Sequence, residues 1–206
     1  MRLSAVFPRE VDMAPLTREE IIKMVERGES LSGKDLSEAD LSYSNLKGAD
    51  LGKAKLSGAH LQNANLENAD LRGADLTQAF LFGSNLQGAD LQGAVFQKTN
   101  LQDTNLEGAS LMRTDLSEAS LFGAQLDGAD LQGAVLTRVR LKRASLVGAN
   151  LRDADLSGAH LQRANLTRAD LTGSNLEGAN LMNADLTGAK MDQTRLEGAN
   201  LQGVIQ

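Results

Sequence analysis

The residues of this chain that could act as acids, bases, nucleophiles or metal ligands are few or far apart. The sequence has two histidines, His60 and His160, and no cysteine, so thiolate chemistry and cysteine-ligated zinc are excluded. Serines are numerous, but none has a histidine and an orienting acid placed to activate it. The glycines recur at regular intervals instead of forming a loop that could cradle phosphate. We therefore expect no catalytic site and no cofactor, and a protein that is not an enzyme.

One acidic series has a regular spacing that could serve a metal ion. Asp50, Asp70 and Asp90 are 20 residues apart, and Lys53 and Arg72 are close to them in the sequence. Carboxylates on neighbouring strands, about 4.8 Å apart, would repel one another and could trap a cation. An exposed row of this kind is usually solvated, and each surface ion pair contributes less than about 1 kcal/mol. We therefore expect no metal site in this series.

The structural element that must position these residues repeats every five residues. From Leu31 to Leu201 every fifth residue is Leu, apart from Phe96 and Met191, which gives 35 tandem repeats. From Leu41 onward a small residue, usually Ala, lies two places before each of these positions. A period of five matches neither a helix nor a strand, so the chain must turn once in every repeat.

Glycine marks the position of the turn. Of the 20 glycines, 18 lie two residues after the repeated Leu, as Gly48 and Gly73 do. A type II turn needs a positive φ at its third residue, which glycine adopts without steric cost. We therefore expect each repeat to be a very short strand followed by a turn.

Units such as Ala49-Asp50-Leu51 and Ala129-Asp130-Leu131 closely resemble the repeats of the pentapeptide-repeat family. The resemblance covers about residues 30–205. It implies an all-β fold, a right-handed quadrilateral β-helix with four repeats in each 20-residue coil, and hence about nine coils in this sequence. The Leu and the small residue would point inward, and the other three residues of each repeat outward.

The sequence divides into an N-terminal extension at 1–16, a capping helix at 17–28 and the solenoid at 29–206. Thr17 and Glu20 have the spacing of a capping box, and Gly28 ends the helical pattern. The first coil of a solenoid would otherwise expose its core and its strand edges. We therefore expect this helix to be an N-terminal α-helical cap.

No helical pattern follows Leu201. This end of the solenoid is either plugged by Val204 and Ile205 or buried against another copy. The second arrangement predicts a homodimer through Leu201, Val204 and Ile205.

The remaining composition bears on location and partners. Residues 1–15 lack a continuous apolar segment of the signal-peptide type, and no stretch approaches the 18 apolar residues of a membrane span. We expect a cytoplasmic protein with no membrane partner. The net charge of −6 argues against nucleic acid as the partner.

The 20-residue register assigns the outward residues to four faces. One face, built on Leu41, Leu61, Leu81 and every twentieth residue onward, carries all the outward aromatic residues of the repeats and both histidines. An exposed row of aromatic side chains suggests a contact surface. The alternative is that large residues simply pack on one another, as Phe80 and Phe82 could. The candidate partner-binding residues are Tyr43, His60, Phe80, Phe82, Phe122, Arg140, Lys142, Arg143, His160 and Arg163.

We interpret the chain as a non-enzymatic scaffold that docks a protein partner of unknown identity on this face. The resemblance adds that such proteins are numerous in cyanobacteria. The alternative is a DNA mimic that binds a type II topoisomerase (gyrase), similar to the quinolone-resistance branch of the family. The negative charge and the duplex-like width of the rod favour this alternative. That branch typically has a C-terminal helix for dimerisation, and several members have loops between coils; this sequence shows neither pattern. A structural, edge-binding or lectin-like module is a third class that no sequence feature separates from the first.

Overall fold

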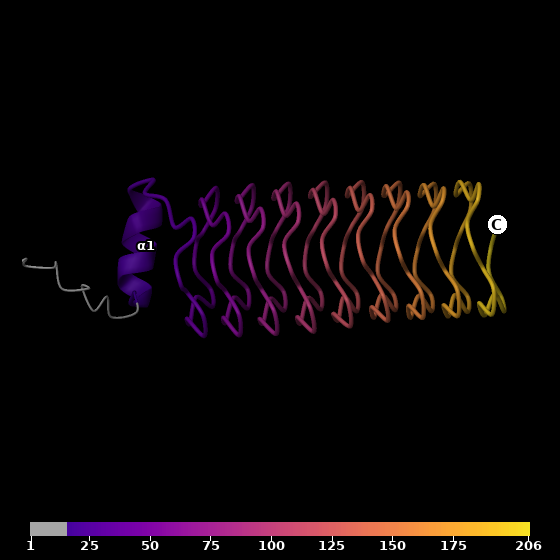
Figure 1. Ribbon diagram of the computed structural model, residues 1–206, viewed down its shortest axis with the longest axis horizontal. Coiled ribbons are helices and arrows are strands. Elements are labelled where there is room, and N and C mark those ends of the chain that lie inside the picture. Colours follow the sequence, from indigo (N-terminus) through magenta and orange to yellow (C-terminus); the bar gives the residue numbers. More distant parts are fainter. Residues whose placement is uncertain (1–15) are drawn as a thin grey trace, which may run out of the picture.

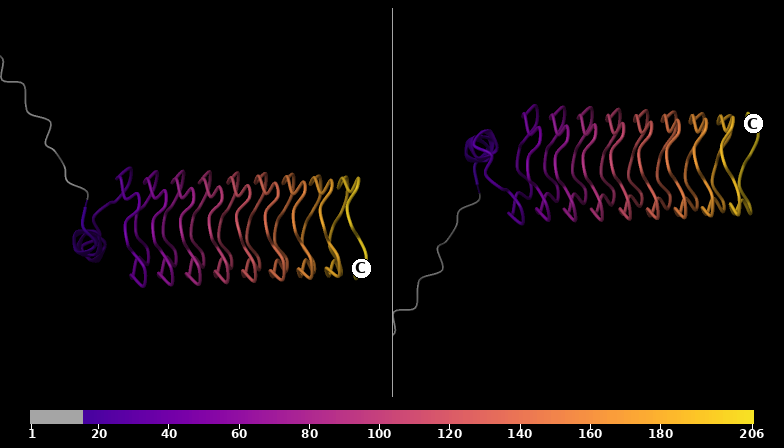
Figure 2. Two further views of the ribbon diagram at one scale, coloured as in Figure 1. Left: turned by 90° about the horizontal axis from the view of Figure 1, so that it is seen from below. Right: turned by 90° about the horizontal axis from the view of Figure 1, so that it is seen from above.

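The structure, a computed structural model, describes residues 16–206. Helix α1, Arg18–Glu26, lies at one end of a single row of stacked coils, and the chain ends at the opposite end of the row (Figure 1). The two views in Figure 2 show the coils following one another without an interruption. The expected extension at 1–16 lies outside the described residues except for Leu16.

Each coil takes 20 residues. Isolated parallel bridges join each residue that precedes a repeated Leu to the residue 20 positions later, from Asp35–Lys55 through to Asp185–Ile205. This register is the one that the sequence predicts. The strands are shorter than expected, because in the described residues the pairing is limited to single-residue bridges between turns.

The core consists of stacked inward side chains of two kinds, the repeated Leu and the small residue that lies two positions before it. Leu121 and Ala124 are typical members, both with an exposed fraction of 0%. Phe96 replaces Leu in its stack and is also fully buried. Where Ser or Thr takes the place of Ala, its hydroxyl donates to a carbonyl in every case but Ser44, as the hydroxyl of Thr99 does to the carbonyl of Leu76 at 2.7 Å. The inward positions of the repeats are therefore filled as the period of five requires.

The turns are of type II. In each turn the N–H of the fourth residue donates to the carbonyl of the repeated Leu, as Ala54 does to Leu51 at 3.0 Å. The third residue has a positive φ whether or not it is glycine: Gly73 has φ 64°, and Lys53 and Arg138 have φ 57° and 54°. A non-glycine residue in this region is strained by about 1 kcal/mol or more. The hydrogen bonds between coils hold these residues in a conformation that non-glycine residues otherwise rarely adopt.

In a repeat between the first and the last coil, one backbone N–H has no backbone acceptor. In the repeat 69–73, the N–H groups of Ala69, Asp70, Leu71 and Gly73 donate to carbonyls, whereas that of Arg72 donates to the Asp70 carboxylate at 3.0 Å. An Asp or Asn before the Leu accepts the equivalent N–H in 21 repeats of the described chain. The recurrence of Asp and Asn at this position therefore has a structural cause.

Helix α1 has defined ends and contacts the solenoid. Thr17 and Glu20 form the expected capping box, and the N–H of Gly28 donates to the carbonyl of Val25 at the C-terminus. Ile21 is fully buried in the same core cluster as the Leu stacks. The guanidinium of Arg18 donates to the carbonyls of Asp40 and Ser42, 22 and 24 residues away in the sequence, at 3.0 and 2.6 Å. The helix is thus attached through both its apolar and its polar side.

Candidate protein-binding face

The register of the coils aligns the candidate residues on one side of the rod. Consecutive bridges join His60 to Phe80 and, further along, Ser120 to Arg140 and Arg140 to His160. We call the outward residues of the repeats centred on Leu41 and every twentieth residue onward the aromatic–basic face. All ten candidate residues belong to it: Tyr43, His60, Phe80, Phe82, Phe122, Arg140, Lys142, Arg143, His160 and Arg163.

The aromatic side chains of this face are exposed. Tyr43 is 76% exposed at a turn position with φ 59°, and Phe80 and Phe82 are 41% and 42% exposed. Phe80 stacks on His60 of the preceding coil, with ring centroids 4.9 Å apart and an angle of 28° between the planes. Phe80 therefore keeps an exposed fraction of 41% although one face of its ring packs on His60.

The basic residues lie further along the rod, around Phe122. The guanidinium of Arg143 lies over the Phe122 ring, 6.0 Å from its centroid. A shallow depression of about 470 Å³ lies beside this pair. Its lining residues are Gln102, Ser120, Phe122, Arg140, Lys142, His160 and Gln162. Sequence reasoning missed Ser120 and the two glutamines, because neither charge nor aromaticity marks them.

The bases of the aromatic–basic face are not neutralised by acids. Within residues 16–206, Arg140, Lys142, Arg143 and Arg163 form no ion pair. On the opposite face, which carries the aspartate series, Arg152 and Lys190 by contrast both pair with Asp170, at 3.5 and 3.6 Å. The aromatic–basic face therefore presents positive charge to the solvent on an otherwise acidic protein.

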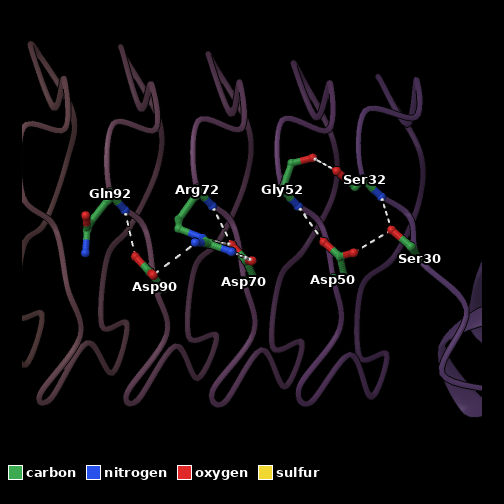
Figure 3. Close-up of polar contacts among 8 residues, drawn as sticks. All are labelled: Ser30, Ser32, Asp50, Gly52, Asp70, Arg72, Asp90 and Gln92. Carbon is green, nitrogen blue, oxygen red and sulfur yellow. Dashed lines mark hydrogen bonds and ion pairs between the residues drawn. The ribbon is translucent and has the colours of Figure 1, made fainter.

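The aspartate series is occupied by internal contacts (Figure 3). Asp50, Asp70 and Asp90 each accept the N–H two residues further on, at 3.2, 3.0 and 3.2 Å. Arg72 pairs with both Asp70 and Asp90, and its hydrogen bonds and charge hold the pKa of Asp70 below the ordinary value. Ser30 donates a short hydrogen bond to Asp50. Oxygens of these carboxylates are therefore engaged by donors of the protein itself, and the series supports the backbone of its turns.

The two histidines stay apart. His60 contacts Phe80 and Gln62, whereas His160 lines the depression beside Arg140. In the part of the chain that the structure describes, no three residues among His, Asp and Glu are placed to hold a metal ion. Nor do residues 16–206 contain a helix with the length and apolar character needed to cross a membrane.

Comparisons with known proteins agree on one family. A sequence model described as pentapeptide repeats matches residues 30–58, 50–88, 89–124, 124–163 and 164–203. No curated protein matches the chain. Among solved structures, HetL, a pentapeptide-repeat protein involved in regulating heterocyst differentiation in Nostoc sp. strain PCC 7120, is 33% identical, with 92% of each chain covered and a TM-score of 0.41.

Two further solved structures are similar. Rfr23 from Cyanothece 51142 is 37% identical over 47% of this chain and 63% of its own, with a TM-score of 0.28. QnrB1, a plasmid-mediated fluoroquinolone resistance protein, is 18% identical over 85% of this chain and 90% of its own, with a TM-score of 0.41.

The family match extends from residue 30 to residue 203, well over half of the chain. It implies that the stacked coils form a right-handed β-helix. The repeats, the 20-residue register and the match together show that this chain belongs to the pentapeptide-repeat family.

Proposed function

We propose that this protein is a non-enzymatic scaffold that docks a protein partner on its aromatic–basic face. Pentapeptide-repeat proteins are generally structural or interaction scaffolds and not enzymes. The observation that carries the proposal is the exposure of Phe80, Phe82 and Phe122, which are 41%, 42% and 36% exposed. They lie on the same face of the rod as bases that have no acidic partner. Exposed aromatic side chains grouped on a rigid surface are typical of binding sites.

The two parts of the face define the chemistry of the partner. The part around Tyr43, Phe80 and Phe82 offers apolar contact area, whereas the part around Arg140 and Lys142 offers positive charge. A partner with an apolar patch beside acidic groups is complementary to this order. In this proposal helix α1 is the cap that covers the core of the first coil. The burial of Ile21 supports this role.

An affinity pull-down from the native source tests the proposal. It compares the wild-type protein with a variant that carries Phe80→Ser, Phe82→Ser and Phe122→Ser. A control variant carries Met112→Ser and Val135→Ser, which remove apolar side chains from two other faces. We expect one partner to be lost from the aromatic variant alone. If all three proteins capture the same partners, the aromatic–basic face is not the docking surface.

The alternative is a DNA mimic that binds gyrase. The net charge of −6 favours it, and QnrB1, a fluoroquinolone resistance protein, shares the fold. The ion pairs of the aspartate series speak against it, because Arg72 and Arg152 neutralise carboxylates that a mimic of the DNA backbone would present. Capture of gyrase by the wild-type and the aromatic variant alike would favour the mimic over the scaffold.

The expected homodimer and the cytoplasmic location stay predictions. Leu201 and Ile205 are 40% and 56% exposed, and Val204 is half-buried, so these side chains offer apolar area to a second copy. Light scattering on this chain measures the mass directly. A dimer that Ile205→Lys converts to a monomer would support the contact, and a monomeric wild-type protein would contradict it.

A further inference from the structure

In three successive coils of the aromatic–basic face, the backbone N–H of the residue after the repeated Leu is unpaired within the described chain. Before Leu121, Leu141 and Leu161, the position that elsewhere holds an Asp or Asn is occupied by Ser120, Arg140 and His160. The N–H groups of Phe122, Lys142 and Gln162 consequently have no acceptor within residues 16–206. The hydroxyl of Ser120 does not replace the missing acceptor; it accepts a hydrogen bond from the side chain of Gln102.

These three donors lie one above another. Phe122, Lys142 and Gln162 are 20 residues apart, so they occupy three consecutive coils, about 4.8 Å from one another. In the 21 repeats with an Asp or Asn, the equivalent N–H points toward the outward side chain before the Leu, so the three free donors face outward too. On the other faces of the described chain, an unpaired N–H of this kind always has a paired one in the adjacent coils. Consecutive unpaired donors occur on the aromatic–basic face alone, here and at Gln62 and Phe82.

The same place carries the unneutralised bases and the depression. Arg140 and Lys142 line it, and Arg143 lies at its edge over Phe122. An adjoining hollow of about 720 Å³ adds the bases Lys98 and Arg138 and the acid Glu118 from the next face. Of the two acids on the aromatic–basic face, Asp40 pairs with Arg18 at the far end of the rod. The other, Asp103, lies one coil before Gly123, and its N–H donates to the carbonyl of Phe122 at 2.9 Å. Backbone donors, positive charge and a concave surface therefore coincide.

We propose that this depression binds carboxylate side chains of an acidic protein segment. Each carboxylate would accept an N–H of Phe122, Lys142 or Gln162, as the protein's own Asp side chains do in other repeats. Arg140 and Lys142 would compensate its charge. The proposal rests on the scaffold function above and assigns the chemistry of the partner at one end of the face.

An acidic protein segment fits this site better than a nucleic acid does. The column spans only three coils, and the protein around it is acidic, with a net charge of −6. A long polyanion would extend beyond the bases and be repelled, whereas a short acidic segment would not. Phe122, which is 36% exposed beside the depression, also offers an apolar contact that side chains next to the carboxylates can use.

The test introduces Asn, an acceptor that the protein uses in other repeats, beside the unpaired N–H groups. The net charge of the protein stays the same. The probe is a fluorescently labelled hexaglutamate peptide with blocked ends, and binding is followed by fluorescence anisotropy at pH 8. The variant Ser120→Asn/His160→Asn supplies an amide oxygen to the N–H groups of Phe122 and Gln162. The control is Ser110→Asn, the same change on another face, where the N–H of Met112 is also unpaired.

We expect the double variant to bind hexaglutamate about fivefold or more weakly than the wild-type protein, because it removes two donors to a charged ligand. The control should bind as the wild-type protein does. Both variants gain hydrogen bonds, so neither should melt at a lower temperature, and a loss of binding cannot be attributed to unfolding.

Three results would overturn the proposal. They are no binding by the wild-type protein, unchanged binding by the double variant, and tighter binding of an oligothymidylate of equal charge, which would assign the site to nucleic acid. The pull-down separates this proposal from the scaffold itself. A partner that the aromatic variant loses and the Ser120→Asn/His160→Asn variant retains would leave the scaffold standing and refute the carboxylate site.

Discussion

The guanidinium of Arg72 binds both oxygens of the Asp70 carboxylate. Its Nε donates to Oδ1 at 2.9 Å and its Nη2 to Oδ2, while the backbone N–H of Arg72 donates to Oδ1 as well (Figure 3). The same guanidinium lies 3.6 Å from Asp90 of the next coil. Asp70 therefore accepts the backbone N–H that has no backbone partner, and Arg72 reduces the repulsion between Asp70 and Asp90.

This pair predicts a specific loss of stability in acid. The hydrogen bonds from Arg72 hold the pKa of Asp70 below its ordinary value in the folded protein. Because the unfolded chain binds the proton more readily, the contribution is complete above about pH 4 and is lost as the pH falls through the lowered pKa. Urea midpoints measured from pH 6 to pH 2.5 should therefore fall less steeply for Arg72→Gln than for the wild-type protein. Parallel curves would show that the pair does not couple folding to protonation.

Two glycines with the same φ are expected to tolerate alanine differently. Gly83 and Gly93 have φ 65° and 67°, so alanine is strained by about 1 kcal/mol at either position. A Cβ at Gly93 would meet no atom within 4 Å, whereas one at Gly83 would lie 2.6 Å from the side-chain oxygen of Asn63. Gly83→Ala should therefore lower the melting temperature more than Gly93→Ala. In an Asn63→Ser background the difference should vanish, and a difference that persists would exclude the contact with Asn63 as its cause.

The acceptor role of Asn can be measured on one face. The side chain of Asn105 accepts the N–H of Glu107 at 3.0 Å, whereas Gln125, one coil further, leaves the N–H of Asp127 unpaired within the described chain. Asn105→Ala should lower the free energy of unfolding by about 1 kcal/mol. Gln125→Ala has no such bond to lose and should change it by less than about 0.5 kcal/mol. Equal effects in urea denaturation would mean that the Asn side chain does not support the turn.

The register of the fold could be predicted because it depends on counting. A Leu at every fifth position and a glycine at the third turn residue fix which residues point inward, and the bridges at 20-residue spacing agree with it. The turn position of Lys53 and Arg138 already implied a positive φ, but the hydrogen bonds between coils that hold these non-glycine residues there are seen only in the structure. The expected short strands are single bridges in the described residues.

The position of the candidate face could also be predicted, but its chemistry only in part. Assigning Phe80 and Arg140 to one face needs only the register, whereas the stacking of Phe80 on His60, and not on Phe82, depends on side-chain geometry. The unpaired N–H groups beside Arg140 become visible only when the hydrogen bonds of a complete repeat are known. The signal that could have revealed them is the absence of Asp and Asn before three successive members of one Leu column, Leu121, Leu141 and Leu161.

Leu121 is the position at which a single charge should disrupt the rod. It is 0% exposed in the middle of a Leu stack, where no described base lies within the core cluster to pair with a carboxylate. Leu121→Asp should therefore destabilise the protein by more than about 3 kcal/mol and lose the cooperative packing of several coils. Gln78→Asp is the matched control, because it adds the same charge at an exposed turn residue whose φ of 58° Asp tolerates. Thermal unfolding followed by circular dichroism distinguishes the two variants. If Leu121→Asp had the same melting temperature as the wild-type protein, Leu121 would not point inward. The assignment of the outward residues to faces would then be wrong as well.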